Sequence, residues 1–153
     1  MGNRAVIVNK KELKNGKLSS KQLGVYLHWN GGRDSVEAFL KYCELQHFRT
    51  PDRDCYGWAR LCQVIGNFFG ADGGGLSLGI DIATRLDPDN GDNGVYIIEG
   101  WKIVGRMYFD GRKEQQYHPL KDMVLAIDEA MPKADRLGEE FISKFLAESD
   151  QTP

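Results

Sequence analysis

The chain has 153 residues, of which 41% are hydrophobic and 27% charged. That length is enough to build one hydrophobic core, and the composition excludes an intrinsically disordered protein. Its 20 basic and 22 acidic side chains leave a formal net charge of -2, so direct nucleic-acid binding, which usually brings a basic excess, is not expected.

The three cysteines are Cys43, Cys55 and Cys62. Their number is odd and no CxxC pair occurs, which predicts reduced thiols and neither a disulfide framework nor a zinc knuckle. The N-terminus lacks an apolar signal-type region, and no run approaches 18 apolar residues. We therefore expect a cytoplasmic protein with no membrane partner.

The first half of the chain predicts two strands and two helices. Residues 4–8 and 24–29 are rich in apolar and β-branched side chains and predict two antiparallel strands. A helix is expected from Asp34 to about His47, with the Asp34 carboxylate capping its first turn as in a capping box. Residues 54–69 carry an apolar stripe at helical spacing, which predicts the second helix.

The second half predicts three strands and two helices. Residues 76–82 alternate apolar and polar side chains, as in a strand with one buried face. A hairpin is expected over 95–109, a third helix from Pro119 and a fourth from Asp135. The order ββααβββαα predicts a single α+β domain over 1–150 with a short tail at 151–153. We expect a mainly antiparallel sheet of about five strands, with about four helices on one side.

The segment YLHWNGGRD, residues 26–34, is the first candidate site. Backbone amides at a helix start bind anions, and Arg33 can add a bidentate contact. The binding residues predicted here are Tyr26, His28, Trp29, Asn30 and Arg33, with weaker support from Arg106 and Arg112. Alternatively, the Asp34 carboxylate occupies those amides and repels an anion, and the aromatic residues only support the fold.

Residues 24–40 resemble the Y-x-H-W-[DN]-G stretch of small uncharacterised proteins of phages, prophages and mobile elements. The resemblance implies an accessory protein that inhibits a host defence component, in the manner of an anti-CRISPR protein, or sequesters its nucleotide signal. The expected partner is accordingly a host defence protein or a small nucleotide, and no cofactor is expected. A structural or assembly protein of the phage particle is a further alternative, and a homo-oligomer is compatible with each of these roles.

The segment DCYGWAR, residues 54–60, is the second candidate site, because a helix N-terminus favours the thiolate of a cysteine such as Cys55. It resembles the segment that carries the nucleophile in NlpC/P60-type cysteine peptidases. This resemblance implies a papain-like hydrolase that uses Cys55 with His118 or His28, although Tyr56 stands where that family has a small residue. Because the sequence places no histidine beside Cys55, a non-enzymatic role is favoured.

The acidic turn at residues 87–92 has the oxygen density that calcium prefers, but it does not follow the EF-hand template, because Asp92 stands where the template needs glycine. The glycine run at residues 71–75 lacks the phosphate-loop pattern, which favours a flexible loop near a binding surface. The histidines have no metal-ligand spacing. No metal site is therefore predicted.

Overall fold

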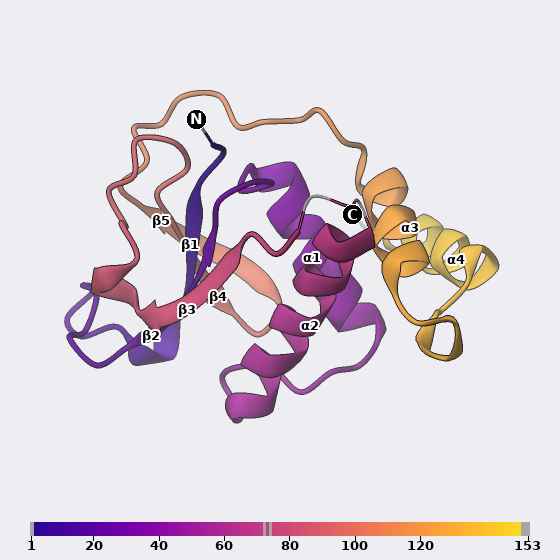
Figure 1. Ribbon diagram of the computed structural model, residues 1–153, viewed down its shortest axis with the longest axis horizontal. Coiled ribbons are helices and arrows are strands. Elements are labelled where there is room, and N and C mark those ends of the chain that lie inside the picture. Colours follow the sequence, from indigo (N-terminus) through magenta and orange to yellow (C-terminus); the bar gives the residue numbers. More distant parts are fainter. Residues whose placement is uncertain (1, 72, 74, 151–153) are drawn as a thin grey trace.

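The computed structural model describes residues 2–71, 73 and 75–150, so the tail predicted at 151–153 lies outside the described residues. The chain folds as an α+β domain with a five-stranded sheet in the order β3-β2-β1-β4-β5 (Figure 1). The strands are β1 (Ala5–Asn9), β2 (Leu23–Leu27), β3 (Leu78–Ile82), β4 (Val95–Glu99) and β5 (Lys102–Met107). The helices are α1 (Arg33–Leu45), α2 (Cys55–Ala71), α3 (Leu120–Ala130) and α4 (Glu139–Asp150), with short 3-10 turns at Lys10–Glu12, Ala83–Arg85 and Lys133–Asp135.

Strand β1 is the central strand of the sheet, and all five of its side chains are buried. It pairs antiparallel with β2 and parallel with β4, and the two remaining pairs, β2–β3 and β4–β5, are antiparallel. The predicted order of elements and the mainly antiparallel sheet are therefore confirmed. The parallel pairing of β1 with β4 was not predicted, because nothing local in either strand marks its partner.

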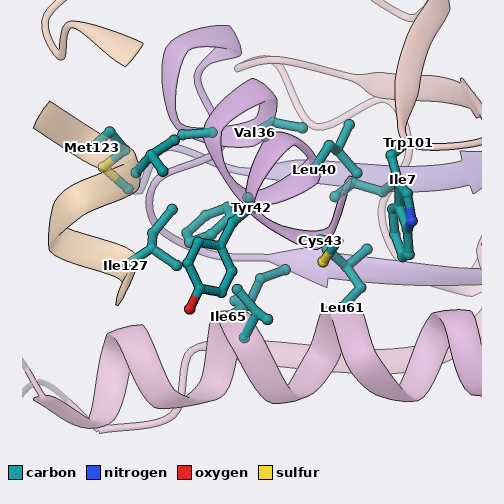
Figure 2. Close-up of a cluster of buried hydrophobic side chains, with 14 of the residues drawn as sticks. Ile7, Val36, Leu40, Tyr42, Cys43, Leu61, Ile65, Trp101, Met123 and Ile127 are labelled. Carbon is teal, nitrogen blue, oxygen red and sulfur yellow. The ribbon is translucent and has the colours of Figure 1, made fainter. Parts of the chain in front are cut away.

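The helices lie on one side of the sheet (Figure 1). Ile7 of β1 belongs to the same buried cluster as α1, α2 and α3, and α4 packs on the outer side of α3. Figure 2 shows Leu40 and Cys43 of α1 beside Leu61 and Ile65 of α2 in this cluster. The opposite face of the sheet is covered by loops, through a smaller cluster built on Val6, Val8, Ala83 and Val95.

A buried carboxylate holds the turn between α3 and α4. Asp128, which is 4% exposed, accepts hydrogen bonds from the Tyr42 hydroxyl (2.5 Å) and from the amides of Leu137 (2.8 Å) and Gly138 (2.9 Å). The side chain thereby joins α1 to the start of α4. The predicted start of the fourth helix at Asp135 was wrong, because that residue closes a 3-10 turn and Gly138, with φ at 93°, lies between the turn and the helix.

The buried face predicted for residues 76–82 was also wrong. Leu78 packs against the helical core, but Ile80 is 57% exposed and Leu76 precedes the strand in solvent. Strand β3 is an edge of the sheet, so an alternating pattern here marks a strand without burying its apolar residues. Within the described residues, no helix is both long and apolar enough to span a lipid bilayer.

Candidate functional site

Helix α1 does not begin with the predicted capping box. Gly32 occupies the N-cap position and makes no side-chain cap, while Glu37 pairs with Arg33 instead of the backbone. The Asp34 carboxylate, 7% exposed, accepts from the adjacent Ser35 amide (2.8 Å) through one oxygen. Its other oxygen accepts from two amides much later in the chain, those of residues 117 (2.9 Å) and 118 (3.0 Å). Asp34 therefore fastens a distant segment.

That segment is residues 108–119, which connect β5 to α3 without helix or strand and are called the strap below. In Figure 1 the strap arches in orange over the N-terminal end of the chain. The amides of Tyr117 and His118 donate to Asp34, and the carbonyl of the Gln115 side chain accepts from Asn3 Nδ2 (2.9 Å). Side chains of the domain thus hold the strap in place.

Neighbouring groups approach Gly31 and Gly32 so closely at this end of α1 that there is no room for a Cβ atom at either position. A Cβ atom at Gly31 would overlap the carbonyl oxygen of Asn3, and one at Gly32 would overlap Oε1 of Gln115. The Gly31 amide also donates to the Asn3 carbonyl (2.8 Å). The glycine pair therefore brings the N-terminal segment and the strap against the start of α1.

The aromatic residues of the predicted site form one cluster at the end of β2. The Tyr26 hydroxyl lies 2.8 Å from Nδ1 of His28, and the His28 ring meets Trp29 edge-on with ring centres 5.3 Å apart. Burial raises the pKa of Tyr26. Trp29 is 47% exposed, and Asn30, with φ at 58°, turns its amide to a serine hydroxyl in the first turn of α1.

Two of the three predicted arginines, Arg33 and Arg106, converge on one carboxylate. Both oxygens of Glu114, in the strap, accept from Nη1 of Arg106 (2.5 and 2.7 Å). Nε of Arg33 lies 3.7 Å from the same carboxylate and 2.6 Å from Glu37. Glu114 was not among the predicted residues, and it turns the arginine pair into a closed ion cluster.

Arg106 has an enclosed environment for a cation. Its guanidinium lies 3.9 Å from the ring centres of both Tyr96 and Phe109, and its Nη2 donates to the carbonyl of Asn93 (2.6 Å). The side chain is 13% exposed. Its Nε is buried and has no acceptor among the described residues. Glu114 is therefore bound through a single nitrogen, and part of the donor capacity of Arg106 is unused.

Next to this cluster lies a polar cleft of about 400 Å³, called the Asn3 cleft below. Its walls come from the N-terminal segment, from the loop before β4 and from the strap. Most of the lining side chains are amides, aromatic rings or cations. They are Asn3, Asn93, Gln115, Phe109, Tyr117, Arg112 and Lys113, together with Gly2 and Asp92. Because Gly2 also borders the His28 ring, the cleft joins the aromatic cluster to the arginine pair.

The acidic turn beside the cleft is anchored to Arg4. Its guanidinium lies 2.8 Å from Asp92 and 3.2 Å from Asp87. The Asn90 side chain organises the turn by accepting from the amides of Asp92 and Gly94 (3.0 Å each). Two of the three carboxylates considered as calcium ligands in the sequence, those of Asp87 and Asp92, are thus paired with an arginine.

Acid should weaken the attachment of this turn through Asp92. Burial raises the pKa of Asp92, but the hydrogen bonds from the Arg4 side chain and amide outweigh it, so the pKa is lower than usual. A carboxylate whose pKa is lower in the folded than in the unfolded state stabilises the fold at pH values above its unfolded pKa. This stabilisation is lost as the pH falls below about 3.9, the usual pKa of an aspartate in an unfolded chain. We expect Asp92→Asn to be less stable than wild type at neutral pH and equally stable in strong acid, as measured by urea unfolding across pH. A constant difference would exclude the linkage.

Cys55 and His118 lie at opposite ends of β1. Cys55 opens α2 in a separate cleft of about 270 Å³ that is also lined by Asn9, at the end of β1. His118 is fastened to Asp34 near Asn3, at the other end of β1. Asn3 and Asn9 are six residues apart in an extended segment, which corresponds to about 20 Å. His28 is at the same end, since its carbonyl accepts from the Asn3 amide. None of the described residues lining the Cys55 cleft is a histidine, so the structure does not place the histidine base of a papain-like pair beside this thiol.

Of the other two cysteines, Cys43 is buried and Cys62 is partly buried. Burial raises the pKa of the Cys62 thiol to about 11 and shifts the pKa of Cys43 upward as well. Both thiols are therefore protonated at neutral pH, as expected of side chains that contribute to packing.

Comparisons with family models, with curated proteins and with solved structures found no match to this chain.

Proposed function

We propose that the protein is a non-enzymatic binding protein and that the Asn3 cleft takes a small nucleotide. The observation that carries the proposal is the lining of the cleft. Its volume of about 400 Å³ is in the range of small-molecule sites. Arg112 and Lys113 can bind phosphate, and the side-chain amides of Asn3, Asn93 and Gln115 can pair with the edge of a base.

Electrostatics also favour an anionic ligand in the cleft. The lining holds two cations, Arg112 and Lys113, and one acid, Asp92, whose carboxylate is already paired with Arg4. Arg112 also pairs with exposed Asp110, outside the lining, at 3.0 Å. The Phe109 and Tyr117 rings offer surfaces on which a base can stack. The described lining holds neither a cysteine nor a histidine, which favours binding over acid–base or nucleophilic catalysis.

The biological role that we propose follows the resemblance of residues 24–40 to proteins of phages and mobile elements. A cytoplasmic protein of that class would act by sequestering a nucleotide signal of the host defence. The support comes from the neighbourhood of that segment, since His28 borders Gly2 of the cleft and Arg33 lies within 3.7 Å of the strap carboxylate.

Native mass spectrometry of protein purified gently from cells tests the proposal. We expect a bound nucleotide-sized mass in the wild type and its loss in the double variant Arg112→Ala and Lys113→Ala. Loss of two charge-assisted contacts should weaken binding at least about tenfold. The variant Lys14→Ala and Lys17→Ala removes the same charge from an exposed turn and should keep the ligand. A clean unliganded mass in the wild type would count against a nucleotide site.

A protein partner is the second candidate, and the exposed aromatic residues near the cleft favour it. Tyr117 is 78% exposed and lines the cleft, and Trp29 is nearly half exposed beside His28. Tyr and Trp are enriched at energetically important positions of interfaces. Under this alternative, which includes inhibition of a host defence protein, Trp29→Ala should reduce capture of the partner in a pull-down from host lysate. Unchanged capture would exclude this surface.

A further inference from the structure

We propose that Glu114 is an internal stand-in for a phosphate group, and that a phosphate takes its place between Arg33 and Arg106 when the Glu114 side chain swings out. The proposal rests on the proposed nucleotide function, because it adds a phosphate subsite to the same cleft. The geometry that points to it is the position of one carboxylate between two guanidiniums, at 2.5 Å from Arg106 and 3.7 Å from Arg33.

The way Glu114 binds Arg106 leaves room for a better ligand. An arginine pairs most strongly with an anion through two parallel N–H bonds, whereas both Glu114 oxygens share Nη1. Arg33 lies 3.7 Å from the Glu114 carboxylate, which is too far for a hydrogen bond. A phosphate has more acceptor oxygens than a carboxylate and can contact Nη1 of Arg106 and the Arg33 guanidinium together. Displacing Glu114 therefore gains a hydrogen bond that the closed state lacks.

The part of the strap around Glu114 is loosely held. The described hydrogen bonds from backbone amides of the strap go to side chains. The amides of residues 117 and 118 donate to Asp34, and the amide of residue 112 donates to Asp110. Most of its residues from 110 to 119 are exposed, and Glu114 and Gln115 are the two that are partly covered. Moving the Glu114 side chain out disturbs no strand pairing and no helix. Segments with few buried contacts open at low free-energy cost.

The subsite is continuous with the Asn3 cleft. Phe109 and Asn93 line the cleft, and the same two residues contact the Arg106 guanidinium through its ring and its carbonyl. Gln115, the neighbour of Glu114, also lines the cleft. A phosphate bound by Arg106 would thus lie beside a base held by the side-chain amides of the cleft.

The test uses inorganic phosphate as the probe, titrated against chloride at constant ionic strength and neutral pH. Binding is measured by NMR from the shift of the Arg106 Nε–H signal. Glu114→Gln removes the competing charge and keeps the side-chain size, so it should bind phosphate at least about tenfold more tightly than wild type. Glu37→Gln is the matched control, because it removes the other carboxylate that pairs with Arg33 without touching Arg106. Its affinity should stay within about threefold of wild type.

A second variant tests the arginine pair without disturbing buried Arg106. Adding Arg33→Ala to Glu114→Gln should return phosphate affinity to the wild-type value or below. Equal affinities of wild type and Glu114→Gln would overturn the proposal, as would a gain that survives Arg33→Ala.

The two proposals fail separately. Phosphate binding as expected, in a protein that never carries a nucleotide-sized mass, would keep the subsite and reject the nucleotide cleft. A co-purified nucleotide, together with equal phosphate affinities in wild type and Glu114→Gln, would keep the cleft and reject the subsite.

Discussion

Replacing Asp128 by alanine is expected to lower the free energy of unfolding by about 3–5 kcal/mol. The carboxylate accepts from one buried hydroxyl, that of Tyr42, and from the amides of Leu137 and Gly138. Alanine leaves these three donors without an acceptor in a site that water hardly reaches. Each unsatisfied buried donor costs about 1–3 kcal/mol, so the sum is a large share of the stability of a domain of this size.

Urea unfolding followed by circular dichroism measures the effect. Glu129→Ala removes the neighbouring carboxylate, which is exposed on the same helix, and should change stability by less than about 0.5 kcal/mol. Tyr42→Phe should cost about 1–2 kcal/mol alone and much less in the Asp128→Ala background, because the two share one hydrogen bond. Equal costs in both backgrounds would mean that Tyr42 and Asp128 are not coupled.

Replacing Asp34 by alanine is expected to release the strap. The Asp34 carboxylate accepts hydrogen bonds from three amides, and two of these are the amides of Tyr117 and His118. Once released, those amides can bind water, so the loss of global stability should be only about 1–3 kcal/mol. The local effect is larger, because Asp34 is one of the few attachments of the strap.

Trypsin reports this opening directly, since it cleaves after Arg112 and Lys113 in the middle of the strap. We expect Asp34→Ala to be cut there at least about tenfold faster than wild type under native conditions, because cleavage follows the population of the open form. Asp122→Ala removes an exposed carboxylate just beyond the strap and should be cut at the wild-type rate. Unchanged cleavage of Asp34→Ala would show that other contacts hold the strap.

Local patterns in the sequence were sufficient for most elements of the fold. The Asn15-Gly16 pair predicts a tight turn, and both residues have positive φ angles of 53° and 73°. The helical stripes of α1 and α2 are buried as expected. The exposure of Ile80 was not predictable in this way, because a strand's place at the sheet edge depends on pairing between distant segments.

The site was only partly predictable for the same reason. Arg33 and Arg106 were both selected from the sequence, but Glu114, which joins them, lies in a polar segment without any pattern. Asp34 was identified as a cap from its position at the start of a helix, whereas two of its three hydrogen-bond partners lie more than 80 residues later. One available signal was the Gly31-Gly32 pair, since adjacent glycines before a helix indicate that other backbone or side chains approach closely.

The parallel pairing of β1 with β4 has a consequence for how the chain folds as it is synthesised. It joins Val6 to Val95, so the central strand lacks one of its neighbours until more than half of the chain has been made. Until then the nascent protein presents an apolar strand with an open hydrogen-bonding edge, which is the kind of surface that aggregates. Contacts so distant in sequence also slow folding, because a long loop must close before they form. Fragments that end before β4 should therefore be insoluble, and the nascent chain is the form most dependent on chaperones.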